Sequence, residues 1–112
     1  DLSVELCTAG WNTYAAMALP GSQLYKNALE KKYKLPISYE GYSFHSYETQ
    51  PLPTETLKAD EILEYRDKSF INYHTHKTFL DKIERKFGQK ALDNIKDMTK
   101  VNLKRKIIDN RL

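Results

Sequence analysis

Cysteine is almost absent from this chain, because Cys7 is the only thiol among 112 residues. A single thiol excludes an internal disulfide and a cluster of thiolates of the kind that holds zinc or an iron–sulfur cluster. It also fits a reducing compartment, and because no basic-then-apolar signal peptide occurs, we expect a cytoplasmic protein. The chain starts at Asp1 rather than Met, which suggests a processed product or a piece of a longer protein.

Long apolar runs are also missing. No stretch approaches the roughly 18 to 20 residues that a membrane span needs, so we expect none. The four glycines are too far apart to form a phosphate-binding loop, and no nucleophile elbow or zinc-protease motif occurs. The length and the hydrophobic fraction of 40% allow one domain at most, with a modest core. Taken alone, the sequence contains no complete active site.

Excess positive charge is confined to the end of the chain. Residues 96–112 contain six basic and two acidic side chains, whereas the first 95 residues contain 12 basic and 13 acidic ones. Such a tail is compatible with a nucleic-acid or membrane-surface patch. We favour cations that complement a helix C-terminus and stay solvated, because no interleaved aromatic residues offer bases a stacking surface. Nucleic acid is therefore not an expected partner.

The first third of the chain has the pattern of one strand followed by one helix. Residues 4–7 start an apolar stretch, and residues 11–19 carry no charge, as in a strand buried on both faces of a parallel sheet. A buried helix is the open alternative, because alanines are frequent there. Pro20 and Gly21 end the stretch, and Ser22 is a competent N-cap. The next helix presents one apolar face, made of Leu24, Tyr25, Ala28, Leu29 and Tyr33. A lone strand–helix unit cannot bury both of its faces.

Residues 36–58 are expected to form a loop rich in proline and aromatic residues. Three of the four prolines lie there and exclude a helix over most of its length. Ordered loops of this length usually have a function or a partner surface. Two interpretations stay open. We favour a strap that its aromatic side chains pin across the helices over a loop in direct contact with a ligand.

The remainder of the chain has helical periodicity. We predict helices over about 59–74 and over 77–87, with Gly88 as a stop, and a third from about 89 onward. The inward positions are Ile62, Leu63, Arg66, Phe70 and Tyr73, then Phe79, Leu80, Ile83 and Phe87, and then Leu92, Ile95, Met98 or Thr99, Leu103 and Ile107. The predicted fold class is therefore mainly α, with an N-terminal strand and helix, an aromatic loop and about three helices.

Three histidines are candidates for chemistry. His74 and His76 form a His-x-His pair at the end of a predicted helix, where the two rings diverge. No acidic residue or cysteine stands beside them at a ligand spacing, so we expect no metal site. His45 lies in the aromatic loop, where a general acid or base is an option. We favour a His45 that is simply hydrogen-bonded to a carbonyl.

Several segments in a fixed order carry a family resemblance. They are AAMALPGSQLY at 15–25, Tyr42-Ser43-x-His45, PLPT at 51–54, EYRDKSF at 64–70, FLDKIERKFG at 79–88 and LKRKI at 103–107. In this order they resemble the C-terminal end of radical S-adenosylmethionine (SAM) enzymes. The subgroup is the one with an N-terminal cobalamin-binding domain, which includes anaerobic magnesium-protoporphyrin ester cyclase-like proteins. The resemblance covers about residues 6–107.

The resemblance implies a domain organisation and a function. Residues 1–35 would be the last strand and helix of the radical SAM partial (β/α) barrel, residues 36–58 the connecting loop, and residues 59–112 a helical C-terminal extension. In this family a Cys-x3-Cys-x2-Cys motif holds a [4Fe–4S] cluster, which cleaves SAM to a 5′-deoxyadenosyl radical. This chain lacks that motif and the cobalamin domain, and Cys7 is not a remnant of the motif.

The chain alone would therefore bind no cofactor and would not be catalytic. It would form one wall of the SAM and substrate site of a longer enzyme that uses SAM, a [4Fe–4S] cluster and, where that domain is present, cobalamin. Its partners would be the barrel and the cobalamin domain of the same polypeptide, and a small-molecule substrate of unknown identity.

The resemblance also implies site residues. In such barrels the end of the last strand lies near the adenosine of SAM, and this maps onto Met17, Ala18, Leu19, Pro20 and Gly21. The substrate side would carry Tyr42, Ser43 and His45. Ligands in general gather at the C-terminal ends of parallel strands, and glycine permits close backbone approach. Residues 73–77 depart from the Thr-Asn-Pro-like turn of related proteins, so details of the extension are not carried over.

The alternative is a free-standing helical interaction module that binds nucleic acid or protein through its basic tail. The coding sequence upstream of Asp1 discriminates between the two hypotheses. An in-frame barrel with the three-cysteine motif favours the enzyme, and a nearby start codon favours the module.

Overall fold

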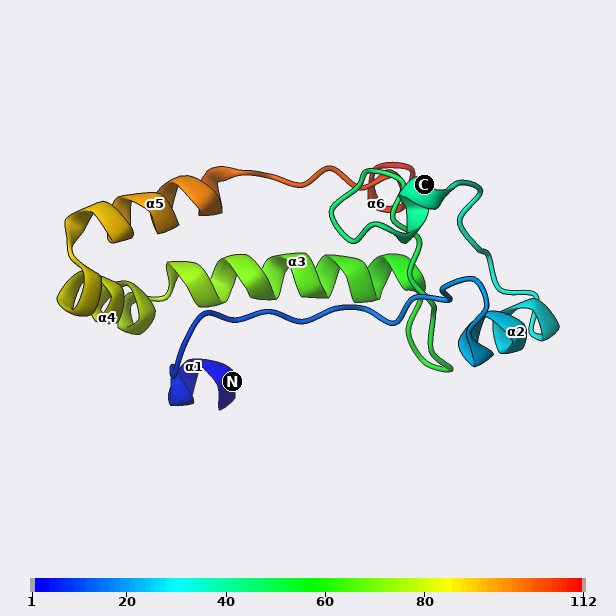
Figure 1. Ribbon diagram of the computed structural model, residues 1–112, viewed down its shortest axis with the longest axis horizontal. Helices are drawn as coiled ribbons and strands as arrows, with labels where there is room; N and C mark the ends of the chain where they lie inside the picture. Colours follow the sequence, from blue (N-terminus) through cyan, green and yellow to red (C-terminus); the bar gives the residue numbers. More distant parts are fainter. Residues whose placement is uncertain (1, 112) are drawn as a thin grey trace. The chain divides into compact units, whose positions relative to one another are not determined.

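The computed structural model describes residues 2–111, and it is mainly helical (Figure 1). The helices are α1 (Leu2–Leu6), α2 (Gln23–Glu30), α3 (Ala59–Thr75), α4 (Lys77–Phe87), α5 (Gln89–Lys100) and α6 (Lys106–Asp109), and a 3-10 turn, η1, spans Tyr39–Tyr42. No strand occurs among residues 2–111. The mainly α fold class is confirmed, whereas the N-terminal strand is not.

Residues 7–19 adopt neither the predicted strand nor the alternative helix. Residues 4–6, which were expected to begin the strand, belong instead to α1. A strand requires a repeated ladder of backbone hydrogen bonds to a neighbour. The Leu52 N–H donates to the Ala16 oxygen at 2.8 Å, but within the described residues Ala15, Met17 and Ala18 have no backbone hydrogen bond. The stretch therefore stays irregular.

The chain divides into two compact units, which are described separately. The first unit contains the residues up to Thr13 together with Asp67–Asn102. The second contains Tyr14–Arg66 and the residues from Leu103 on. The start of α3 thus belongs to the second unit and its end to the first. The three-part division expected from the sequence stays a prediction.

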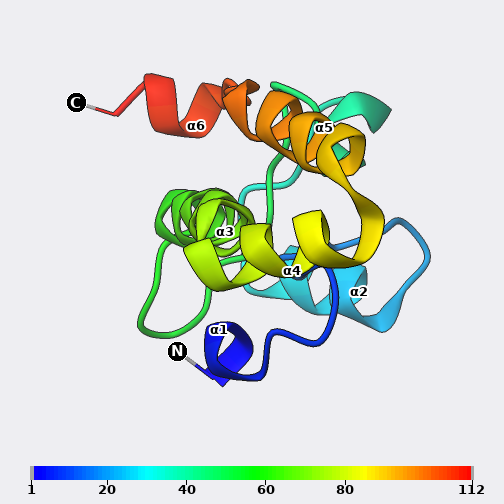
Figure 2. The same cartoon turned by 90° about the vertical axis from the view of Figure 1, so that its left-hand side faces the viewer.

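In the first unit, α4 and α5 pack against each other (Figure 2). The Gly88 N–H donates to the Glu84 oxygen at 2.9 Å and closes α4, and α5 begins at the next residue, as predicted. A hydrophobic core lies beside them. It contains Cys7, Tyr73 and Phe79, with Val4, Trp11, Leu80, Ile83 and Ile95 packed against it.

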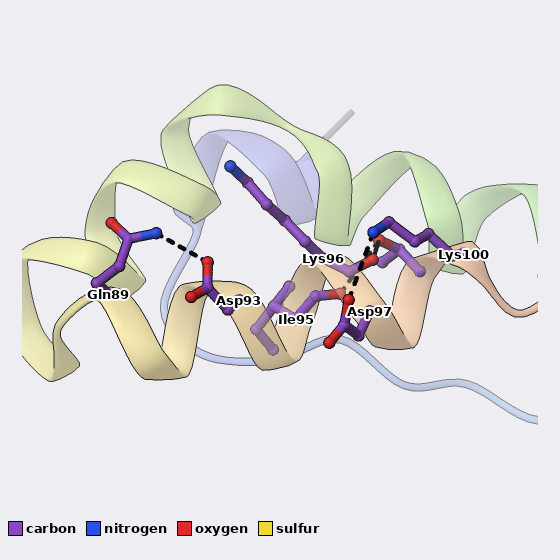
Figure 3. A network of polar contacts seen from close by, with 7 residues as sticks. Gln89, Asp93, Ile95, Lys96, Asp97 and Lys100 are labelled. Atoms are coloured by element: carbon purple, nitrogen blue, oxygen red, sulfur yellow. Dashed lines mark hydrogen bonds and ion pairs between the residues drawn. The ribbon is translucent and has the colours of Figure 1, made fainter.

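The surface of α5 carries polar contacts between neighbouring turns (Figure 3). The Gln89 side-chain amide donates to the Asp93 carboxylate at 2.8 Å, and Lys100 Nζ lies 3.4 Å from the Asp97 carboxylate. Pairs at these spacings stabilise a helix by a few tenths of a kcal/mol, roughly 0.2 to 0.5 each. They mark this face as solvent-facing.

Three of the predicted inward positions need correction. Phe87 is the last residue of α4 and is 69% exposed, because the chain turns at Gly88. Leu103 and Ile107 do not continue the stripe of α5, because this helix ends at Lys100 and Val101 is extended. Leu63, Phe79 and Leu92 are buried as predicted.

The second unit contains the aromatic loop, which bends back on itself around Gly41. An ideal Cβ built on Gly41 would lie only 2.4 Å from the Pro36 Cβ. The Gly41 oxygen accepts a hydrogen bond from the Gln50 N–H at 3.1 Å. Glycine is therefore required here by close contact between two parts of the loop.

Candidate functional site

A tight turn connects the extended residues 14–19 to α2. The Leu19 oxygen accepts hydrogen bonds from the Ser22 N–H at 3.1 Å and from the Ser22 hydroxyl at 2.6 Å. Pro20 occupies the second position of the turn and Gly21, with φ of 88°, the third, which is the pattern of a type II turn. Ser22 Oγ accepts the Tyr25 N–H at 3.1 Å and caps α2, as predicted.

The five residues expected on the cofactor side lie on this turn and directly before it. Leu19, Pro20 and Gly21 are exposed, Met17 is half-buried, and Ala18 is only 2% exposed. A Cβ added to Gly21 would meet no atom within 4 Å, so the space beside this backbone is open. The turn offers backbone groups and apolar surface, and it contains no acid, base or nucleophile.

The loop residues 43–49 are held by hydrogen bonds around a buried hydroxyl. Thr49 is 0% exposed, and its Oγ1 lies 2.5 Å from the Ser43 oxygen and 2.8 Å from the Ser46 oxygen. The Ser46 hydroxyl donates to the Glu40 oxygen at 2.5 Å. Backbone oxygens that would otherwise lack partners are thus satisfied without a helix or a sheet.

Arg105 closes this loop from a distant part of the sequence. Its side chain is 1% exposed, and its Nη1 donates to the Phe44 oxygen at 2.6 Å and to the Ser46 oxygen at 3.1 Å. The same nitrogen lies 3.2 Å from Thr49 Oγ1. Arg105 was expected to be one of the solvated cations of the tail, and that expectation is wrong. The sequence carries no local signal for this burial, because Arg105 lies between two lysines, Lys104 and Lys106, that are both exposed.

Phe44 is the aromatic anchor of the loop. It is 8% exposed, and the Arg66 guanidinium lies 4.8 Å from its ring centroid. The ring of Tyr14 meets it edge-on, with centroids 5.0 Å apart. Cation–π and edge-to-face contacts of this kind each contribute about 0.5 to 2 kcal/mol when they are shielded from water. They support the favoured interpretation of the loop as an aromatic strap.

The three residues expected on the substrate side have different environments. Tyr42 is half-buried, and burial, followed by the nearby phenols of Tyr25 and Tyr39, raises the pKa of Tyr42 above its ordinary value of 10. At neutral pH its hydroxyl can therefore donate a hydrogen bond but cannot act as a base. Ser43 and His45 are exposed.

His45 does not have the expected hydrogen bond to a carbonyl. Among the described residues its side chain makes none, and its ring lies edge-on to Phe44 with centroids 6.1 Å apart. No hydrogen bond or ring contact within residues 2–111 joins the substrate-side residues to the turn at Gly21. Their placement in one site stays a prediction.

The two histidines of the His-x-His pair have separate roles in the first unit. His74 is 4% exposed; its Nδ1 lies 2.8 Å from the Phe70 oxygen, and its Nε2 accepts the Trp11 N–H at 3.4 Å. His76 is exposed and caps α4 by accepting the Thr78 N–H at 3.2 Å. Across residues 2–111, no group of three or more histidine, cysteine or acidic side chains is arranged to hold a metal ion.

A cleft of about 240 Å³ lies elsewhere in the second unit. Its walls are Lys34, Leu35, Pro36, Ile37, Glu48, Gln50, Lys106, Ile107 and Asn110. None of the predicted site residues lines it. The Lys106 ammonium in its wall is already paired with the Glu48 carboxylate at 3.0 Å.

Several cations of the basic tail are paired with other groups of the second unit. Besides Arg105 and Lys106, Arg111 pairs with the carboxylates of Asp60 at 2.5 Å and Glu64 at 2.8 Å. Cations with partners inside the protein contribute less to a nucleic-acid surface than solvated ones, because releasing them breaks those pairs.

No family model, curated protein or solved structure matches this chain. Within residues 2–111, none of the helices combines the length and the apolar character that crossing a bilayer requires.

Proposed function

We propose that this chain is the C-terminal part of a radical SAM enzyme of the cobalamin-binding subgroup. Met17, Ala18, Leu19, Pro20 and Gly21 supply one wall of the SAM site, and Tyr42, Ser43 and His45 face the substrate. Residues from 59 on form a helical extension. The chain is inactive alone, because it depends on the barrel and the cobalamin-binding domain of the same polypeptide.

The observation that carries this proposal is the combination of an apolar extended segment with a glycine turn and a capped helix. Tyr14 is 64% exposed and Leu19 53%, although both lie in an uncharged stretch. The α2 side chains of Leu24 and Leu29 are also about half exposed, at 49% and 53%. Exposed apolar groups on both parts fit a strand–helix unit that packs against neighbouring strands and helices.

The residues of this chain do not fit an iron–sulfur cluster. Such a cluster is held by several thiolates, whereas Cys7 is the single thiol and is only 6% exposed. The cluster and the radical chemistry belong, in this proposal, to the barrel. The residues near Gly21 contribute backbone polar groups and apolar contacts, which would orient the adenosine part of SAM.

A matched pair of glycine substitutions tests the placement of the site. Gly21 and Gly88 have φ of 88° and 87°, and a Cβ on either would meet nothing within 4 Å. Gly21→Val and Gly88→Val, each made in the full-length polypeptide, therefore introduce similar backbone strain of about 1 to 3 kcal/mol. We expect Gly21→Val to weaken SAM binding in calorimetry by tenfold or more, on the order of 1.4 kcal/mol, and Gly88→Val to leave it near wild type. Equal losses for the two variants would contradict the placement.

The coding sequence upstream of Asp1 tests the family assignment itself. An in-frame barrel with a Cys-x3-Cys-x2-Cys motif is expected. A start codon within a few residues of Asp1 would sink the proposal.

A further inference from the structure

His74 is held by two hydrogen bonds of opposite sense. Its Nδ1 lies 2.8 Å from the backbone oxygen of Phe70, one turn earlier on α3, and only a protonated nitrogen can donate to a carbonyl. Its Nε2 lies 3.4 Å from the backbone nitrogen of Trp11, which is long for a hydrogen bond, and must be unprotonated to accept that N–H. Together the two contacts require the neutral imidazole with its proton on Nδ1.

The surroundings of the ring are unsuited to a positive charge. The side chain is 4% exposed and lies among aromatic rings, with centroid distances of 4.3 Å to Phe70 and 5.1 Å to Phe79. Three titratable groups belong to the surrounding core: Tyr73 on α3, whose ring centroid lies 5.2 Å from that of His74, Cys7 in the N-terminal segment and Lys82 on α4, which binds the Cys7 oxygen. None of the three is a carboxylate that would compensate an imidazolium.

We propose that His74 is a proton-sensitive latch for residues 7–11. The neutral ring fastens the Trp11 backbone to α3. A proton added at Nε2 replaces the acceptor by a donor that faces the Trp11 N–H, and it places a cation in an apolar environment. Histidine is the side chain whose unperturbed charge change falls between about pH 5 and 8. The latch is closed while the ring is neutral and opens when Nε2 is protonated.

Other hydrogen bonds hold the N-terminal segment to α3 and α4 without involving His74. The Tyr73 hydroxyl donates to the Ala9 oxygen, and Lys82 Nζ donates to the Cys7 oxygen at 2.5 Å and to the Thr8 oxygen at 3.2 Å. Burial raises the pKa of Tyr73 above 10, so its hydroxyl stays protonated throughout the histidine range. Opening therefore begins at Trp11. This inference stands independently of the proposed function.

Trp11 is the only tryptophan of the chain, so its fluorescence reports on the latch directly. When the 112-residue chain is acidified from about pH 8, we expect one transition, with emission moving to longer wavelength as Trp11 leaves the core. His74→Gln keeps polar atoms but cannot become charged in this range, so its emission should not depend on pH. His76→Gln and His45→Gln alter exposed histidines and should retain the transition.

Three results would overturn the latch: no transition in the wild-type chain, a transition that persists in His74→Gln, or one that disappears in His76→Gln. A second measurement needs no variant and covers the case in which His74→Gln fails to fold. Nitrogen-15 NMR of the wild-type chain at about pH 8 should show His74 as the neutral tautomer with its proton on Nδ1. A proton on Nε2 would refute the proposal.

Discussion

The two units satisfy their backbone polar groups in different ways. In the first unit, α4 and α5 pair their own N–H and C=O groups, and the side chains of Tyr73 and Phe79 are available for an apolar core. In the second unit, residues 43–49 have no helix, and the buried side chains of Thr49 and Arg105 supply donors to their backbone oxygens. The first unit should therefore be most sensitive to loss of apolar volume, and the second to loss of single polar groups.

Two phenylalanines on α4 provide the largest expected contrast within the first unit. Phe79 is 3% exposed and Phe87 is 69% exposed, so the same substitution removes a core ring at one position and a surface ring at the other. We expect Phe79→Ala to lower the free energy of unfolding by about 3 to 5 kcal/mol and Phe87→Ala by about 0.5 kcal/mol or less. Urea unfolding followed by circular dichroism measures both. Similar losses would show that the described core does not stabilise this unit.

Arg105 provides the corresponding test of the second unit. Arg105→Ala leaves the buried Phe44 oxygen without its donor and removes one of the donors to the Ser46 oxygen, and we expect a loss of about 3 kcal/mol. Hydrogen exchange should rise sharply across residues 43–50. The exposed neighbour serves as the control, because Lys104→Ala removes a cation of the same tail and should leave exchange unchanged. If both variants behave alike, the buried contacts of Arg105 are not what holds the loop.

Tyr73→Phe is expected to change the free energy of unfolding of the first unit by less, and to change its dependence on high pH. Burial is the main reason that the pKa of Tyr73 is raised, so the stability that depends on the neutral phenol is complete below about pH 10 and is lost as the pH rises through the higher folded-state value. Tyr73→Phe should cost about 1 kcal/mol at neutral pH, because the bond to the Ala9 oxygen is lost. The variant should also lose less stability than wild type as the pH rises above about 10. An identical alkaline profile would contradict this role of the phenol.

The smallest effect is expected at the ion pair between Lys77 and Asp81, which lie one turn apart on the surface of α4. The carboxylate of Asp81 raises the pKa of Lys77 through a hydrogen bond, but both side chains are solvated and screened. Asp81→Asn should leave the unfolding midpoint unchanged within error. A clear loss would mean that polar contacts matter to the first unit as they do to the second.

The parts of the fold that the sequence predicted well are those with local causes. The C-terminal end of α4 and the start of α5 follow from Gly88, and the start of α2 follows from the Ser22 side chain. The predicted strand had no such local cause, since residues 11–19 require a neighbouring strand that the described residues do not contain. Phe87 was misplaced because helical periodicity says nothing about where the chain turns away from the core.

The candidate site was predictable to a lesser extent. The turn at Pro20 and Gly21 has a local signature, and it forms as predicted. The burial of Arg105 depends on carbonyl groups about 60 positions earlier in the chain, and no sequence window of helical or strand length contains both partners. His74 could have been suspected, because it follows Phe70 and Tyr73 on one apolar stripe, but its partner Trp11 lies 63 residues away.

The close approach of Gly41 to Pro36 has a consequence for recognising homologues of this protein. Pro36 Cβ lies only 2.4 Å from the place where any other residue at position 41 would put its first side-chain carbon, which is too close for two carbon atoms. A random library built on this loop should thus return one amino acid at that position, whatever is selected for elsewhere. A proline followed five residues later by an invariant glycine, inside an aromatic stretch, is therefore a fingerprint that distant relatives should share even where every surface residue has diverged.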